Sequence, residues 1–364
     1  MRTLIVVAEL GSGGAETMVD TLARQLTDAG DLVTVASNGG WRADRLAEDG
    51  IATLEVPLRS ASPVSLLRAV LRLRREVRRR PVDVVHAHNV RAALAARLGT
   101  FGLRPRPRLV CTVHGLADAH YGPAARLLRR CADVVVAVSA DVLDRLRAAG
   151  LDEGRLRVVE NAAPVLPAPD RAGARRRIGL APDREVVLCL ARLAPPKRHD
   201  LLLDAWPEVP GGALLLLAGD GPERGSLARR VRAEGLTDRV SLLGDRRDVA
   251  DLLAASDALV LASDREGLPV SVLEAFSAGV PVVASAVGGL RTLDPGAVEL
   301  VAPGSAHELA RGLARVLGDP ARRDAMRVAS RAVWERRFTS IAMVAAYRDL
   351  YLAFGIRRPS RHVG

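Results

Sequence analysis

The chain of 364 residues is about two and a half times as long as a typical domain of ~150 residues, so we expect two domains. Hydrophobic residues make up 49% and charged residues 26%, which excludes a disordered chain, and no apolar stretch reaches the ~18 residues of a membrane-spanning helix. The net charge of +11 could attract nucleic acid, but three Trp, three Tyr and four Phe are too few for stacking on single strands, so we expect no nucleic-acid partner.

Short apolar runs alternate with helical patterns from the N-terminus onward. The runs predict strands at residues 4–8, 32–36, 82–86, 109–113, 134–138 and 156–159, and a helix at 16–26. Continuous apolar strands are typical of parallel sheets that are covered by helices on both faces. We therefore expect an α/β, doubly wound domain over residues 1–165.

A segment rich in Pro and Ala at residues 162–169 predicts a linker, after which the alternation restarts. Strands are predicted at 186–190, 214–218, 240–243, 259–261 and 282–284, and helices at 222–234, 269–278, 321–337 and 340–354. We expect a second doubly wound domain over residues 166–339 and a C-terminal helix and tail over 340–364. Ligands of such sheets bind beyond the carboxyl ends of the strands, and a cleft between two such domains is the expected active site.

A glycine-rich loop, G-S-G-G-A-E from Gly11 to Glu16, separates the first strand from the first helix. Glycines at a helix N-terminus let backbone N–H groups approach an anion or a sugar. A dinucleotide fingerprint would require glycine in place of Glu16, and the second strand ends in Ser37-Asn38 without an acidic residue. We therefore do not expect NAD, and a tight turn without a ligand is the alternative.

Two basic residues, Arg192 and Lys197, follow the first strand of the second half. Arginine offers a planar fork to phosphate oxygens, and lysine offers a compact charge. Of the 53 basic residues all except Lys197 are arginine, which indicates that this position requires an ammonium group. The alternative is two surface cations in a loop.

Two glutamates, Glu266 and Glu274, are separated by seven residues where a loop turns into a helix. Pro269 suits the first helical turn, and the free N–H groups of that turn could hold a phosphate. Carboxylates accept hydrogen bonds from vicinal hydroxyls, so the pair could hold a sugar and a ribose. A capped surface helix is the alternative.

Three histidines, His86, His88 and His114, end two strands of the first half and could contact substrate. No Cys, Asp or Glu completes a zinc site beside them, and the chain has no Asp-x-Asp pair for a metal-bridged nucleotide. Three cysteines without metal-like spacing, and a first strand too close to Met1 for a signal peptide, favour a cytoplasmic protein.

An arginine-rich helix is predicted around residues 66–80, where Leu66, Leu67, Val70, Leu71 and Val77 provide its apolar side. It could be a basic amphipathic face for an anionic membrane. We favour the alternative, a solvated basic face on a helix that covers the sheet. Its arginines are Arg68, Arg72, Arg74, Arg75, Arg78, Arg79 and Arg80.

Together these motifs resemble the GT-B retaining glycosyltransferases of the "glycosyl transferases group 1" family, with its E-x7-E motif. The resemblance covers nearly the whole chain, although Ala191 replaces the common glycine before Arg192, and Asn161-Ala162-Ala163 departs from the usual hinge sequence. The matching segments are Gly13 to Glu16, Val85 to His88, Thr112 to Gly115, Ala137 to Ser139, Arg192 to Lys197, Leu217 to Glu223, Glu266 to Glu274 and Gly288-Gly289.

The resemblance implies a GT-B fold, in which two Rossmann-like domains face a central cleft and the C-terminal helix crosses back to the first domain. It also implies roles for individual residues. The implied catalytic residues are Glu266, Lys197, Arg192 and His114; the donor is bound by Gly14, Arg192, Lys197, Gly267, Leu268 and Glu274, and the acceptor side is at Gly13, Asn89 and His120.

The implied reaction transfers a sugar, with retention and without a metal or other cofactor, from a nucleotide-diphosphate donor to a hydroxyl group. We favour UDP over GDP or dTDP, and a glycan or glycolipid acceptor of cell-surface polysaccharide synthesis. A secondary-metabolite acceptor is an alternative, since the arginine-rich composition is typical of actinobacteria. A non-catalytic sugar-nucleotide or membrane-binding protein and a sugar-nucleotide epimerase are alternatives of other classes. We expect a cytoplasmic protein, with peripheral contact at the inner face of an anionic membrane as an option.

Overall fold

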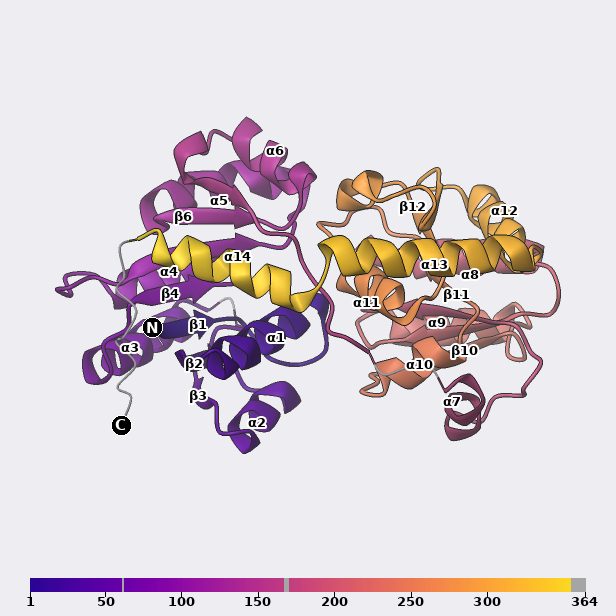
Figure 1. The fold of residues 1–364 in the computed structure, drawn as a ribbon, viewed down its shortest axis with the longest axis horizontal. Coiled ribbons are helices and arrows are strands. Elements are labelled where there is room, and N and C mark those ends of the chain that lie inside the picture. The colour runs from indigo at the N-terminus through magenta and orange to yellow at the C-terminus, as the bar shows by residue number, and fades with distance from the viewer. Residues whose placement is uncertain (61, 167–169, 355–364) are drawn as a thin grey trace. The chain divides into compact units, whose positions relative to one another are not determined.

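The computed structural model describes residues 1–60, 62–166 and 170–354, which form two compact units (Figure 1). The first unit contains Met1–Asn161 and the helix that begins at Ser340, and the second contains Ala162–Thr339. The division after Asn161 precedes the boundary predicted after residue 165. Residues 167–169 of the predicted linker and 355–364 of the predicted C-terminal segment lie outside the described residues.

The first unit is built on a sheet of seven parallel strands in the order β3-β2-β1-β4-β5-β6-β7. The chain order reverses between β1 and β4, so the connections after these two strands run in opposite directions along the sheet. The strands are β1 (Arg2–Val6), β2 (Leu32–Ser37), β3 (Ala52–Glu55), β4 (Val84–Ala87), β5 (Arg108–Val113), β6 (Val134–Ala137) and β7 (Leu156–Val158).

Helices cover the faces of this sheet, as continuous burial of its central strands requires. They are α1 (Gly14–Asp28), α2 (Trp41–Glu48), α3 (Pro63–Arg79), α4 (Val90–Gly99), α5 (Asp118–Cys131), α6 (Ala140–Ala148) and α14 (Ser340–Leu352), with a short 3-10 turn, η1 (Glu153–Arg155). The side chains of Asn89 and Ser139 accept hydrogen bonds from backbone N–H groups and cap α4 and α6.

The C-terminal helix α14 belongs to the first unit although the preceding 178 residues, Ala162–Thr339, form the second. The hydroxyl of Tyr347 lies 2.9 Å from Oγ1 of Thr112, and that of Tyr351 lies 2.6 Å from Nδ1 of His86. Both tyrosines are buried. The prediction that this helix packs on the first domain is therefore confirmed.

The second unit repeats the architecture with six parallel strands in the order β10-β9-β8-β11-β12-β13. Its order reverses between β8 and β11. The strands are β8 (Val186–Leu190), β9 (Leu214–Ala218), β10 (Val240–Gly244), β11 (Ala258–Leu261), β12 (Val282–Ser285) and β13 (Val298–Val301). The helices and 3-10 turns are α7 (Arg171–Arg177), η2 (Pro195–Lys197), α8 (His199–Ala205), η3 (Trp206–Glu208), α9 (Arg224–Ala233), α10 (Val249–Ala255), α11 (Val270–Ala278), η4 (Gly288–Thr292), α12 (Ala306–Leu317) and α13 (Pro320–Arg337).

The predicted α/β class with two doubly wound domains is confirmed, and the predicted strands at 186–190 and 214–218 coincide with β8 and β9. Two strands were not predicted, β3 and β13. Both lie at a sheet edge and carry a glutamate, so they lack a continuous apolar run. None of the β3 residues is buried, and only Val298 and Val301 of β13 are. Across the described ranges, every helix is too short or too polar to cross a bilayer.

Candidate functional site

The predicted donor-site residues of the second unit follow β8 and β11, the two strands between which the strand order reverses. Lys197 ends η2, after β8, and its Nζ lies 2.5 Å from Oε1 of Glu266, which follows β11. The hydroxyl of Ser263 donates to the same oxygen at 2.6 Å. Doubly wound sheets bind ligands at such a reversal, so this ion pair stands where a ligand is expected.

Backbone and side-chain contacts hold the loops after β8 and β11 together. The N–H of Asp264 donates to the carbonyl of Pro196 at 3.0 Å, and the guanidinium of Arg198 lies 3.0 Å from the carboxylate of Asp264. Arg198 has a left-handed backbone, with φ of +51°, which turns the chain from η2 into α8. These contacts hold the two loops in the positions that allow Lys197 to reach Glu266.

A third loop, after β12, closes against the backbone of Glu266. Gly288 has φ of +49°, and a Cβ at this position would lie 1.8 Å from the carbonyl oxygen of Glu266. The N–H of Gly289 donates to the carbonyl of Gly267 at 3.0 Å. Gly288 therefore permits a backbone approach that any larger residue would block.

The other predicted donor residues of the second unit are in the loops after β8 and β11 and in α11. Gly267 and Leu268 are buried in the loop that leads into α11, and Glu274 is half-buried within α11. Arg192, in the loop after β8, is exposed, and within the described residues its guanidinium forms no ion pair. An exposed guanidinium in the same loop as the ammonium of Lys197 is suited to binding a diphosphate.

Burial shifts the pKa values of two residues near Lys197, Cys189 and His199. It raises the pKa of the Cys189 thiol to about 12, so this cysteine is neutral and not a nucleophile at pH 7. Burial, helped by the charge of Lys197, lowers the pKa of His199 to about 4. Both ring nitrogens of His199 are buried without a hydrogen-bond partner among the described residues. Cys189 and His199 are therefore neutral neighbours of Lys197 at pH 7.

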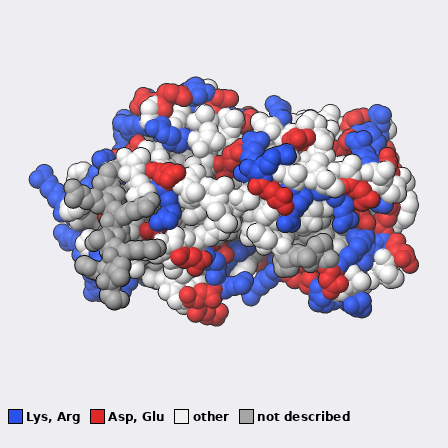
Figure 2. Space-filling model, viewed as in Figure 1, with Lys and Arg blue, Asp and Glu red and all other residues white. Residues whose placement is uncertain are grey.

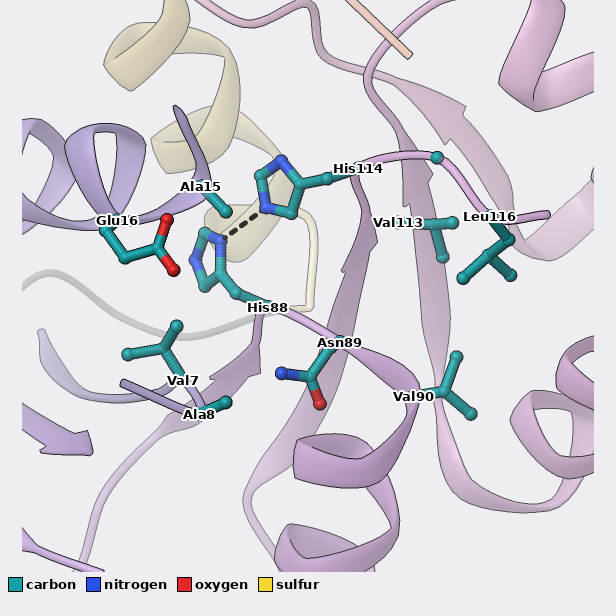
Figure 3. Close-up of a pocket in the computed structure, with 11 residues that line it drawn as sticks. Val7, Ala8, Ala15, Glu16, His88, Asn89, Val90, Val113, His114 and Leu116 are labelled. Carbon is teal, nitrogen blue, oxygen red and sulfur yellow. Dashed lines mark hydrogen bonds between the residues drawn. The ribbon is translucent and has the colours of Figure 1, made fainter. Parts of the chain in front are cut away.

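The first unit contains a pocket of about 210 Å³ at its own reversal point, beyond the ends of β1, β4 and β5 (Figure 3). His88, His114, Asn89 and Glu16 are its polar side chains, and the figure shows the two imidazoles facing each other. The lining residues are Val7, Ala8, Ala15, Glu16, His88, Asn89, Val90, Val113, His114, Gly115 and Leu116.

The two pocket histidines form a hydrogen-bonded pair, with Nδ1 of His88 3.1 Å from Nε2 of His114. Burial lowers the pKa of His114 to about 4 and that of His88 well below its usual value, so both rings are neutral at pH 7. One ring donates to the other, so in either arrangement the two outer nitrogens comprise one donor and one acceptor. Those outer nitrogens are buried without a partner among the described residues.

His86, by contrast, has both of its ring nitrogens hydrogen-bonded to other side chains of the first unit. Its Nε2 lies 2.7 Å from Oγ1 of Thr112 and its Nδ1 bonds Tyr351 of α14, and burial lowers its pKa to about 3. The sequence pattern could not separate His86 from His88. In the structure His86 lies within β4, whereas His88 lies just beyond the end of the strand and lines the pocket.

The predicted acceptor-side residues fall in three different settings. Gly13 is exposed at the start of α1, as is the predicted donor residue Gly14, and Asn89 lines the pocket while capping α4. His120 is exposed in the first turn of α5 and is not among the residues that line this pocket. Sequence reasoning missed two polar residues of these sites, Ser263 and Glu16. Glu16 is visible in the glycine-rich motif, whereas no pattern marks Ser263.

Family models match both halves of the chain: "Glycosyltransferase Family 4" matches residues 12–165 and "Glycosyl transferases group 1" matches residues 184–319. A D-inositol 3-phosphate glycosyltransferase of Kribbella flavida is 30% identical over 395 aligned residues, covering 93% of this chain and 91% of its own. The lipopolysaccharide core biosynthesis glycosyltransferase LpsD of Rhizobium meliloti is 29% identical, covering 93% and 95%.

Among solved structures, HepE of Anabaena in complex with UDP-glucose superposes with a TM-score of 0.86 at 23% identity, covering 97% of this chain and 100% of HepE. The similarity confirms the predicted GT-B fold. Together with the family models and the two relatives, it assigns the protein: the chain belongs to the glycosyl transferases group 1 family, and it is a glycosyltransferase.

Proposed function

We propose that the protein transfers a sugar from a nucleotide-diphosphate donor, UDP in our first choice, to a hydroxyl group with retention of configuration. The observation that carries the proposal is the Lys197–Glu266 ion pair at the reversal point of the second sheet. A carboxylate for sugar hydroxyls and an ammonium for phosphate are side by side there. The crystallisation of the similar HepE with UDP-glucose supports UDP as the nucleotide.

We assign the donor's parts to residues of the second unit. Lys197 and Arg192 bind the diphosphate, Glu266 binds hydroxyls of the transferred sugar, and Glu274 binds the ribose. The N–H groups of Gly267 and Leu268, which precede α11, add donors for phosphate oxygens. Ser263 holds the carboxylate of Glu266 in place through its hydrogen bond.

The proposed chemistry follows the charge that develops during transfer. The bond between the anomeric carbon and the phosphate oxygen breaks, and its electron pair leaves with the diphosphate. Lys197 and Arg192 stabilise that negative charge, and we propose that they do so without a metal ion. The acceptor oxygen forms its bond on the same face of the sugar, and its proton passes to the departing phosphate oxygen. Glu266 holds the sugar and forms no covalent bond.

We assign the first unit to the acceptor and to the transferred sugar, with His114 and Gly14 contacting the reacting groups. The unpartnered donor and acceptor of the His88–His114 pair suit hydroxyl groups, which carry both functions. Gly13 and Asn89 lie at or near the same pocket, and His120 would contact a more distant part of the acceptor. The proposed acceptor is a cell-surface glycan or glycolipid, because the relative LpsD is a lipopolysaccharide core biosynthesis glycosyltransferase. We place the reaction in the cytoplasm, in keeping with the three free, buried cysteines.

Transfer assays would test this proposal. The protein is incubated with UDP-, GDP- and dTDP-sugars and a panel of glycan, glycolipid and inositol phosphate acceptors, and the product is analysed by NMR. We expect nucleotide release that depends on an acceptor, and a product with the anomeric configuration of the donor. An inverted product would overturn the retaining mechanism. Conversion of the donor without an acceptor would instead favour an epimerase, and no reaction of any donor would favour a binding protein.

A further inference from the structure

Helix α3 presents apolar side chains to solvent. Its core-facing residues are Ala69, Leu73 and Val77. Leu67 and Leu71, which the sequence grouped with the apolar side of the helix, are instead 58% and 57% exposed, and Val64 is 58% exposed. At 3.6 residues per turn these three residues share the face of α3 that points away from the sheet.

The same outward face carries uncompensated positive charge. Arg68, Arg75, Arg78 and Arg79 are exposed, and within the described part of the chain none of them forms an ion pair. Glu76 is the one acidic residue of α3, and it faces Arg80 at 3.6 Å. Exposed arginines without an ion pair also occur elsewhere among the described residues, for example Arg229 and Arg232 on α9. What distinguishes α3 is that its arginines share a face with exposed apolar side chains, Leu67 and Leu71.

A neighbouring loop extends the apolar surface. Phe101, which follows α4, is 70% exposed. Its carbonyl accepts a hydrogen bond of 2.7 Å from Arg74, one helical turn beyond Leu71. We call Val64, Leu67, Leu71 and Phe101, with the four arginines named above, the α3 surface. Figure 2 shows Lys and Arg side chains at the left edge of the first unit.

We propose that the α3 surface docks on the face of an anionic lipid bilayer. Leucine and phenylalanine side chains enter the boundary between head groups and acyl chains, and the arginines contact lipid phosphates. Each basic residue near an anionic membrane strengthens binding about fivefold at physiological ionic strength. A nucleic acid or an acidic protein surface would use the arginines but leave the exposed leucines in water, so the combination favours a membrane. The inference does not depend on the proposed transfer reaction.

Vesicle flotation with the full-length protein tests the inference. Vesicles of phosphatidylcholine alone are compared with vesicles that contain phosphatidylglycerol, over a series of salt concentrations. We expect binding to the anionic vesicles that weakens as salt rises. Arg75→Glu with Arg78→Glu should reduce the partition coefficient at least about 25-fold, and Leu67→Ser with Leu71→Ser at least about tenfold.

Two matched controls exclude non-specific effects. Arg229→Glu with Arg232→Glu makes the same charge change on α9, where both arginines are exposed and the apolar neighbours Leu227 and Val231 are buried. Val328→Ser removes an apolar side chain that is at least as exposed, on α13. Both controls should bind vesicles within about twofold of the wild type. Thermal melts of all variants identify any that fail to fold, and because the four α3 residues are exposed, we expect wild-type melts.

Three outcomes would overturn the inference: no binding to anionic vesicles, equal binding by the Arg75→Glu, Arg78→Glu variant, or wild-type binding by the leucine variant. The last, together with tight binding of a DNA duplex, would assign the surface to a soluble polyanion. A nucleotide-induced thermal shift is measured on the same samples. Its persistence would show that the failure concerns the α3 surface and not the proposed reaction.

Discussion

The ammonium of Lys197 lies 2.5 Å from Oε1 of Glu266, although the two residues are 69 positions apart in the sequence. The lysine side chain is 26% exposed and the glutamate side chain 8%, so the pair is reachable from solvent on the lysine side. A diphosphate that binds Lys197 would therefore meet a charge whose position is already fixed. Preorganised charge of this kind needs no rearrangement when negative charge develops on a leaving group.

Replacement of Lys197 by alanine should leave the fold intact and reduce turnover by at least about 100-fold, as expected for the loss of a donor to a developing oxyanion. Glu266 keeps its bond from Ser263, which limits the structural cost. Steady-state transfer rates with saturating donor provide the measurement, and Arg229→Ala on α9 is the control. A folded Lys197→Ala protein with near-wild-type transfer would refute the assignment.

Replacement of Ser263 by alanine should act through Glu266. The substitution removes a 2.6 Å hydrogen bond to its carboxylate, a contact that contributes about 1.5–3 kcal/mol when one partner is charged. We expect a tenfold or larger fall in kcat/KM, partly restored by Ser263→Thr, which keeps the hydroxyl. An unchanged kcat/KM for Ser263→Ala would contradict a positioning role.

Replacement of Gly288 by alanine should destabilise the second unit, because its Cβ would collide with the Glu266 carbonyl and its φ is positive. Backbone strain of this kind costs about 1–3 kcal/mol, and the collision adds to it. Gly304 is a matched control, since it also has positive φ (+76°) but no atom lies within 4 Å of an added Cβ. Urea denaturation should show a larger loss for Gly288→Ala than for Gly304→Ala. Equal losses would mean that the close approach is not required.

The protein should lose stability on acidification. The folded-state pKa of His86 is lowered to about 3 and those of His114 and His199 to about 4, so the unfolded chain binds protons first as the pH falls below about 6.5. Stability therefore decreases from pH 6.5 towards pH 4, by up to about 1.4 kcal/mol per pH unit for each histidine. Urea denaturation at pH 7 and pH 5 measures the loss, and His199→Leu should reduce it. An identical loss in His199→Leu would show that His199 is charged or accessible in the folded state.

Much of the fold follows from local sequence patterns. Buried parallel strands such as β8 and β9 require continuous apolar residues, so each strand can be predicted from its own short segment of sequence. The edge strands β3 and β13 each carry a glutamate and do not have this pattern. The family motifs also predict Lys197 and Glu266 as site residues from the sequence alone.

What the sequence could not predict depends on contacts between distant segments. The bond from Ser263 to Glu266 and the approach of Gly288 require three loops to converge, which no local pattern encodes. The orientation of α3 was also hidden, because its leucines fit more than one helical face. The structure selects the face that buries Ala69, Leu73 and Val77, and it leaves Leu67 and Leu71 in solvent.

The most direct test of the proposed donor site is a thermal shift with UDP, GDP and dTDP and their sugar conjugates, with and without EDTA. A ligand at one hundred times its Kd stabilises the folded protein by about 2.7 kcal/mol, which a melting curve resolves. We predict a shift with one nucleotide, UDP by preference, that survives EDTA and is lost in both Glu274→Ala and Lys197→Ala but kept in Arg229→Ala. The absence of a shift with every nucleotide, or an equal shift in the Lys197→Ala protein, would contradict the assignment of this site to a nucleotide-sugar donor.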